Sequence, residues 1–246
     1  MAYVLSDLIL QPGEFFRALA AEPAAYKGPV LIVFVWGCLT GIQTFFLMNW
    51  LMGAFLAAAP AQPGIGLMAG ISVFIALMAA VFAVPMAFVY WGVAALGLYL
   101  IGGIFSRTGS IYHTLTAIAW GMIPLAVCDT IRSGVFLLYK NAMTLTISPE
   151  FINMTMNSHA AGSRSPSSMS SAELAKYISY NPAFHEYTLV SFAVFAIALL
   201  ACSWFWFHAL QHTRSLTPRQ AAITVFVPVL ILIGVKLASL LTGGVA

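Results

Sequence analysis

Charge is what this chain most lacks: only 7% of its residues are charged, whereas 61% are hydrophobic. Soluble domains are roughly 25% charged, so the composition excludes an ordinary soluble fold and predicts an integral membrane protein. The apolar runs are long enough to cross a hydrocarbon core, which takes about 20 helical residues. Strands of a membrane barrel would instead give short alternating segments. We therefore expect an all-α bundle of membrane-spanning helices.

Cysteine and catalytic motifs are also scarce. Cys38, Cys128 and Cys202 all lie inside apolar runs, so neither a disulfide framework nor a CxxC metal signature is present. Ten Lys and Arg against seven Asp and Glu, without a basic cluster, argue against nucleic acid as a partner. The chain has no nucleophile elbow, HExxH, P-loop or dinucleotide fingerprint. We expect neither an enzyme nor a bound cofactor.

The apolar runs predict five transmembrane helices. They cover about residues 29–52, 67–105, 112–139, 187–210 and 218–241. The second run is too long for one perpendicular crossing, so either a hairpin turning at Pro85 or one long helix must be considered. A turn at Pro85 would leave backbone groups without partners in lipid, which favours one helix bent there. Pro124 and Pro228 predict bends in the third and fifth spans.

Two segments lie outside these spans. Residues 1–28 predict a cytoplasmic or interfacial segment that contains an amphipathic helix. This helix would either rest on the membrane surface or pack against the bundle. Residues 29–246 form the membrane domain. Within it, residues 140–186 are rich in Ser, Asn, Thr and Pro and predict a long outer loop.

Basic residues predict the orientation of the chain. The short segments on one side of the membrane hold Arg17, Lys27, Arg107, Arg214 and Arg219, whereas the first loop and the tail hold none. Short cytoplasmic loops carry an excess of Lys and Arg. We therefore expect the amino end inside, the carboxy end outside, and a multi-pass protein of the cell membrane.

Three charged residues fall inside predicted spans. Asp129 and Lys236 lie at nearly the same depth in the third and fifth spans, and Arg132 is one turn beyond Asp129. Asp129 therefore pairs with Lys236, with Arg132, or with both in one network. Ionisable groups in a membrane are functional candidates because isolated ones are costly there. The alternative is a structural pair that sets helix register.

Histidine supplies the remaining candidate ligands. His208 and His212 are four residues apart at the inner end of the fourth span, and His113 begins the third span at a similar level. Three imidazoles suit a transition metal. No acidic or cysteine partner is evident near them on that side, so we expect no metal site.

Several short motifs resemble those of the Yip family of Ypt/Rab-interacting membrane proteins, in its prokaryotic type. The resembling residues are Pro12, Phe15 and Phe16, then Tyr26, Gly28 and Pro29, then Gly109 and Ser110, then Gly121 and Pro124. The resemblance covers most of the chain and implies five spans with the amino end inside. Ala24 and Ala25 stand where eukaryotic members have an acidic residue, and Lys27 interrupts the Tyr-Gly-Pro motif. These departures argue against a small GTPase as partner.

Two functions from different classes remain open. The first is a non-enzymatic scaffold or adaptor, whose amphipathic start and inner loops, with Arg107, His113, Arg214 and Arg219, contact lipid headgroups or a partner protein. The second is a translocator of a small solute, ion or lipid that uses Asp129, Arg132 and Lys236. Five spans make a small bundle for transport. That reading favours an oligomer, with Gly37 and Gly41 as a possible contact face.

Overall fold

The computed structural model describes residues 5–58, 65–148, 150–151 and 177–241. Five stretches in this part of the chain are long and apolar enough to cross a membrane. They confirm the predicted all-α, five-span membrane fold. Most of the predicted outer loop, residues 152–176, lies outside the described residues.

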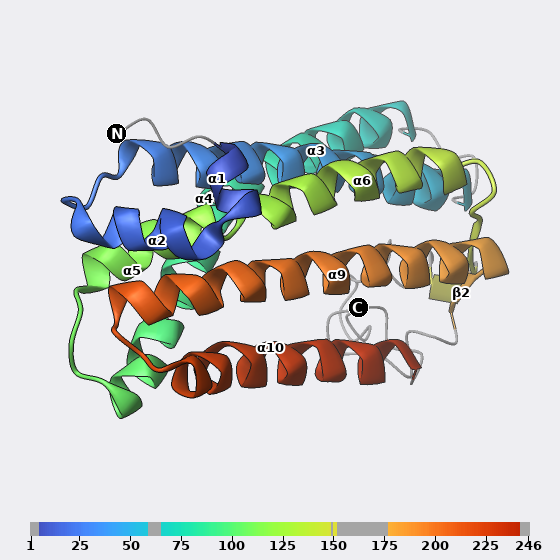
Figure 1. Cartoon of the computed structure of the whole chain (residues 1–246). Coiled ribbons are helices and arrows are strands. Elements are labelled where there is room, and N and C mark those ends of the chain that lie inside the picture. Colours follow the sequence, from blue (N-terminus) through green and yellow to red (C-terminus); the bar gives the residue numbers. More distant parts are fainter. Residues whose placement is uncertain (1–4, 59–64, 149, 152–176, 242–246) are drawn as a thin grey trace, which may run out of the picture.

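The described residues contain ten helices and strands (Figure 1). In chain order they are α1 (Leu5–Leu10), α2 (Pro12–Ala21), α3 (Lys27–Ala58), α4 (Ile65–Phe105), α5 (Ile111–Trp120), α6 (Ile123–Tyr139), β1 (Leu145–Ile147), β2 (Ile178–Tyr180), α9 (Pro182–Thr213) and α10 (Pro218–Leu241). The long helix α4 runs through Pro85 without a break, as expected from the lack of polar residues around it. The observed helices extend beyond the predicted spans by a few residues at several ends.

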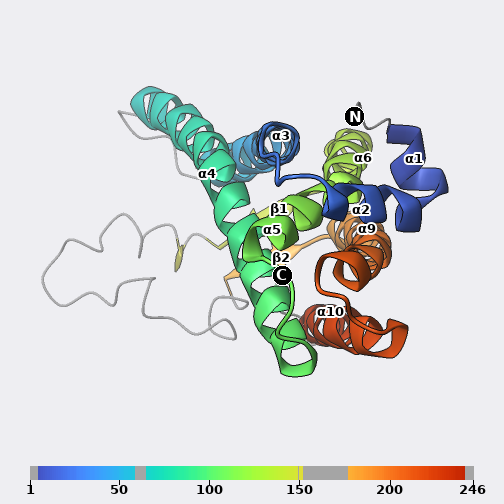
Figure 2. The ribbon, with the colours of Figure 1, turned by 60° about the vertical axis from the view of Figure 1, so that its left-hand side comes forward.

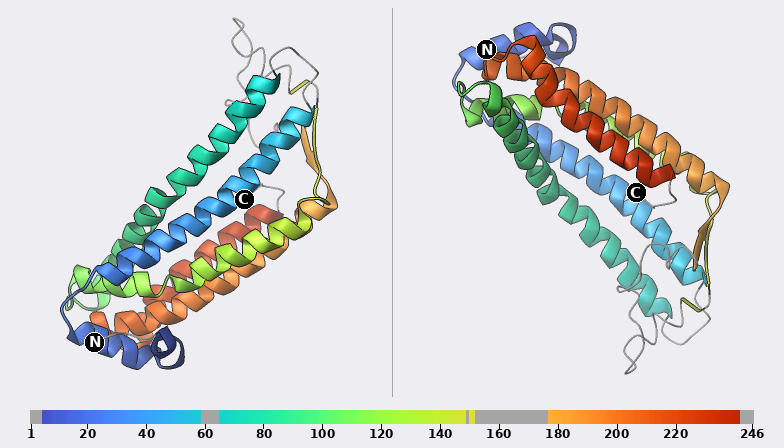
Figure 3. Two further views of the ribbon diagram at one scale, coloured as in Figure 1. Left: turned by 90° about the horizontal axis from the view of Figure 1, so that it is seen from above. Right: turned by 90° about the horizontal axis from the view of Figure 1, so that it is seen from below.

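The long helices form two groups. α3 and α4 pack along each other, and α9 packs against both α6 and α10. Contacts between α3 and α6 join the two groups. α4 and α10 approach each other at the carboxyl end of α4 and diverge toward the other end of the molecule (Figures 2 and 3). α1 and α2 lie at the end of the bundle where α4 and α10 meet, and the strands lie at the opposite end (Figure 1).

Gly37 and Gly41 bring α3 and α4 together. A Cβ atom at Gly37 would lie 2.9 Å from the Val84 Cα, and one at Gly41 would lie 2.6 Å from the Ala80 carbonyl oxygen. Such distances leave room only for glycine. The prediction that this face joins two copies of the chain is corrected, because α4 of the same chain occupies it.

The third span is two helices rather than one. α5 ends at Trp120 and α6 begins at Ile123, with a turn between them. Gly121 lies against the Trp206 indole so closely that a Cβ atom would overlap it. Pro124 stands in the first turn of α6, where a missing backbone N–H costs nothing. The expected bend is therefore a helix break.

The amino-terminal segment packs against the bundle. Leu8 in α1 and Phe15, Phe16 and Leu19 in α2 are buried. They form one apolar cluster with Ala117 of α5 and Ala209 of α9, and Trp120 packs at its edge. Of the two alternatives for this helix, docking on protein is the one observed for its apolar face. Glu14 and Arg17 form an exposed ion pair at 2.8 Å on the opposite face.

The ends of the outer loop are held together by a short antiparallel ladder, which the composition did not predict. β1 pairs with β2, with Leu145 opposite Tyr180. Asn181 stabilises the junction between this ladder and α9. Its side-chain oxygen accepts hydrogen bonds from the Thr144 and Phe184 backbone N–H groups. Its side-chain amide donates to the Ala142 carbonyl over 2.7 Å. As a helix cap, Asn181 starts α9 five residues before the predicted position.

The tight α3–α4 contact generates a prediction for Gly41→Ala. The added methyl group meets a backbone carbonyl, so we expect the free energy of unfolding to fall by about 1–3 kcal/mol. Gly53→Ala on the same helix is the matched control, because a Cβ atom there meets nothing within 4 Å. Thermal unfolding of the purified protein in detergent measures both. Loss of an oligomer at unchanged melting temperature would contradict the intrachain role.

Candidate functional site: a polar network between three spans

The predicted intramembrane carboxylate is the centre of a hydrogen-bonded network. Asp129 on α6 is 6% exposed. Its Oδ2 accepts from the Thr40 hydroxyl over 2.6 Å and from the Trp36 indole N–H over 3.0 Å. Both donors come from α3, one turn apart. The carboxylate thus connects α6 to the middle of α3.

Arg132 completes the network toward α9. Its Nη1 lies 3.3 Å from Asp129 Oδ1, and its Nε donates to the Ser191 hydroxyl over 2.7 Å. Gln43, with its amide nitrogen facing Asp129, donates to Oδ1 over 3.1 Å, and its side-chain oxygen accepts from Arg132 Nη2 over 3.2 Å. The Asp129 side chain is 8% exposed and that of Arg132 is 29% exposed. In this ion pair the Asp129 carboxylate is therefore buried, whereas the Arg132 guanidinium is partly exposed at the surface of the bundle.

This arrangement explains how two charges are tolerated. Insertion scales assign at least about 2.5–3.5 kcal/mol to an isolated charge at the centre of a membrane helix. Here the Asp129 carboxylate receives hydrogen bonds on both oxygens, and Arg132 is neutralised by its neighbour one turn away. Hydrogen bonds to charged groups are stronger than those between neutral groups. The network contributes to association of α3, α6 and α9.

Lys236 lies apart from this pair. Its Nζ is 5.6 Å from the Phe195 ring centroid, and the side chain is exposed. Within the described residues no ion pair joins it to a carboxylate. It lies on the wall of a cavity of about 540 Å³ that also contacts α3, α4, α6 and α9. Of the three predicted charges, the structure brings together Asp129 and Arg132.

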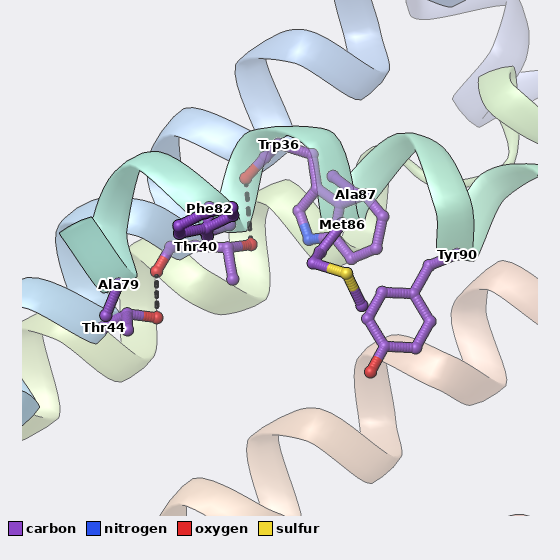
Figure 4. Close-up of a pocket in the computed structure, with 9 residues that line it drawn as sticks. Trp36, Thr40, Thr44, Ala79, Phe82, Met86, Ala87 and Tyr90 are labelled. Atoms are coloured by element: carbon purple, nitrogen blue, oxygen red, sulfur yellow. Dashed lines mark hydrogen bonds between the residues drawn. The ribbon is translucent and has the colours of Figure 1, made fainter.

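A second cavity of about 270 Å³ lies between α3 and α4. Trp36, Thr40 and Thr44 line it from α3, and Phe82, Met86 and Tyr90 line it from α4 (Figure 4). The Thr40 hydroxyl oxygen also lies 3.0 Å from the Trp36 carbonyl oxygen, and the Thr44 hydroxyl donates to the Thr40 carbonyl over 2.8 Å (Figure 4). Trp36 contacts both cavities as well as Asp129.

The predicted inner-loop residues gather at the end of the bundle that carries α1 and α2. Arg107 and Arg219 are exposed, whereas Arg214 is 1% exposed. The Arg214 guanidinium lies 4.1 Å from the centre of the Tyr99 ring and donates to the Ser106 carbonyl over 2.6 Å. It closes the carboxyl end of α4, where a cation is favoured by the helix dipole. Arg214 is therefore a packing residue.

The three histidines do not converge. The His113 Nε2 lies 3.0 Å from the Glu22 carbonyl oxygen, which fastens α5 to the linker after α2. His208 faces α2, with its Nδ1 3.6 Å from the position of a Cβ atom at Gly13. No group of three His, Cys, Asp or Glu side chains suited to a metal is found in the part of the chain that the structure describes.

Four members of the network were not predicted: Trp36, Thr40, Gln43 and Ser191. Gln43 carried a usable signal, because an amide within an apolar span needs partners and polar residues often join membrane helices. Thr40 stands three residues before Gln43 and shares its helix face, whereas Trp36 and Ser191 gave no signal, since Trp and Ser occur throughout these spans.

Comparison with known families identifies the chain. The model of the Yip1 domain matches residues 6–240, from α1 to α10. The chain belongs to the Yip1 family. This membership confirms the predicted family resemblance, and with the five apolar helices it makes the chain a multi-pass membrane protein. Neither the curated proteins nor the solved structures returned a match.

The residues that carry the resemblance lie at close contacts in this Yip1 domain. Gly109 has a φ of +88°, and a Cβ atom there would overlap the Thr213 carbonyl oxygen. Ser110 caps α5 by accepting from the Tyr112 backbone N–H over 3.2 Å. A Cβ atom at Gly28 would lie 3.0 Å from the Trp120 ring. The motif residues therefore assemble the end of the bundle at which α1 and α2 dock.

The geometry of the network generates a prediction for Asp129→Asn. The substitution leaves the Arg132 charge without a counter-ion, so we expect the free energy of unfolding to fall by about 1–3 kcal/mol. Arg132→Met in the same chain should restore much of this loss, whereas Lys236→Met should restore none. Thermal unfolding in detergent measures all variants. Thr130→Val is the control, because the Thr130 hydroxyl bonds only within its own helix. Rescue by Lys236→Met would contradict the observed pairing.

Proposed function

We propose that this protein is a non-enzymatic membrane adaptor that presents its α1–α2 end to a partner protein. The observation that carries the proposal is the two-sided character of α1. Leu8 is buried against the bundle, whereas Ile9 and Leu10 are 60% and 78% exposed. Exposed apolar side chains on α1, together with an exposed ion pair on α2, Glu14 with Arg17, are a typical composition for a protein contact.

The polar network supports an adaptor rather than a translocator. A translocating carboxylate must exchange partners during its cycle, and both Asp129 oxygens are already engaged by α3 and α6. The carboxylate also has little exposed surface through which a solute or proton could reach it. We therefore assign Asp129 and Arg132 to helix association and Lys236 to a separate role.

Photo-crosslinking in native membranes tests the adaptor. A photoreactive residue at position 9 or 10 should yield one defined crosslinked protein product. The same residue at position 138, an exposed site on α6, is the control and should react with lipid alone. Ile9→Asp combined with Leu10→Asp should remove the product at an unchanged melting temperature, because neither side chain is buried. Lipid adducts alone at positions 9 and 10 would contradict a protein partner and support a membrane-organising scaffold.

Flux through liposomes is the complementary measurement. The adaptor predicts that wild type and Asp129→Asn leak ions and small solutes at the rate of empty liposomes. Flux that Asp129→Asn abolishes and Thr130→Val preserves would overturn the adaptor in favour of a translocator.

We further propose that α1 and α2 face the inside of the cell membrane. Arg107 and Arg219, both exposed, lie at that end, and basic residues in short loops favour the cytoplasmic side. Ser179 in β2 is exposed at the opposite end. In intact cells an impermeant maleimide should label Ser179→Cys, and Arg107→Cys should react only after permeabilisation. The reverse labelling pattern would contradict this orientation.

A further inference from the structure

The 540 Å³ cavity beside α10 combines apolar walls with one cation. Its lining includes residues of α4 and α10, two helices that diverge in Figures 2 and 3. Its volume is within the range of about 300–1,000 Å³ found for small-ligand pockets. The lining includes Trp36, Gly97, Leu98, Trp206, Val229 and Lys236.

The polar groups of the two lining tryptophans are engaged elsewhere. The Trp36 N–H donates to Asp129, and the Trp206 N–H donates to the Ile118 carbonyl over 3.0 Å. Each indole therefore offers its hydrocarbon surface to the cavity. Apart from Tyr90 and Lys236 the lining side chains are apolar or have their polar group engaged, so these walls suit an alkyl chain better than a polar solute, which would lose more hydration than it regains in hydrogen bonds.

Lys236 supplies the one charge on these walls. It stands 18 residues beyond Pro218, the start of α10, which is about 27 Å at 1.5 Å per residue. A hydrocarbon core is about 30 Å thick, so with Pro218 at one boundary the ammonium comes within reach of the headgroups at the boundary far from α1 and α2. No carboxylate among the described residues pairs with it. An anion from outside the chain would satisfy it.

We propose that this cavity holds one acyl chain of an acidic phospholipid, with the headgroup phosphate at Lys236. The apolar walls match the chain, and the unpaired ammonium matches the anionic headgroup. A free fatty acid has related chemistry, but the bilayer surrounding an open cavity supplies phospholipid. The site is independent of the role proposed for α1 and α2, since none of their residues lines the cavity.

Native mass spectrometry of the full-length protein tests this site. The protein is equilibrated in detergent with equal amounts of dioleoyl phosphatidylglycerol and dioleoyl phosphatidylcholine, and the retained lipids are counted. Wild type should keep one phosphatidylglycerol, preferred over phosphatidylcholine by about fivefold, the size expected from one basic residue near a membrane surface. Lys236→Met should lose the preference. Because Lys236 is exposed and packs little, this variant should fold normally.

A second variant tests the acyl-chain part of the site. Gly97 lines the cavity and a Cβ atom there meets nothing within 4 Å, so Gly97→Phe should fill the cavity and release the retained lipid. Gly92→Phe is the matched control: it is on the same helix, equally open, and outside the lining. An unchanged preference in Lys236→Met, lipid retained by Gly97→Phe, or equal loss in Gly92→Phe would each overturn the proposal. Replacement of phosphatidylglycerol by an equal amount of oleate would also overturn it in favour of a fatty acid site.

Discussion

The hydrogen bonds received by one carboxylate hold the centre of this bundle together. Lipid offers polar groups no partners, so a charge in α6 is stable only if neighbouring spans supply donors. Trp36 and Thr40 do so from α3, and Arg132 passes the connection to Ser191 on α9. Because the donors are directional, they select one rotation and one depth for each helix. Apolar contact alone would permit many combinations of helix rotation and depth.

The sequence predicted the helices far better than their arrangement. Span number follows from length and hydropathy, and the uninterrupted α4 follows from the absence of polar residues near Pro85. Asp129 and Arg132 were predicted to be neighbours because three residues make nearly one helical turn. Counting residues along the spans predicted a similar depth for Lys236, but its ammonium lies beside the Phe195 ring instead, because a count of residues carries no information about direction. A helix that is apolar all round does not reveal which side faces protein.

The glycine pair on α3 illustrates the same limit at the level of partners. Gly37 and Gly41 were correctly interpreted as a close-contact surface, but the spacing of the two glycines does not indicate which helix packs against them. α4, the next helix in the chain, does so. Likewise, the helix break at Gly121 depends on Trp206, which is distant in sequence. By contrast, the amphipathic pattern of α2 located its buried face because its polar residues mark the opposite side.

Trp36 belongs at once to the polar network and to the walls of both cavities. An occupant that pushes the indole aside must break its bond to Asp129, whereas one that rests against the ring in place leaves the bond intact and restricts its motion. Binding of an occupant that displaces the indole would therefore be thermodynamically linked to the contact between α3 and α6, and each would alter the other by the same free energy. If the proposed phospholipid is such an occupant, the composition of the bilayer would change the stability of this helix contact.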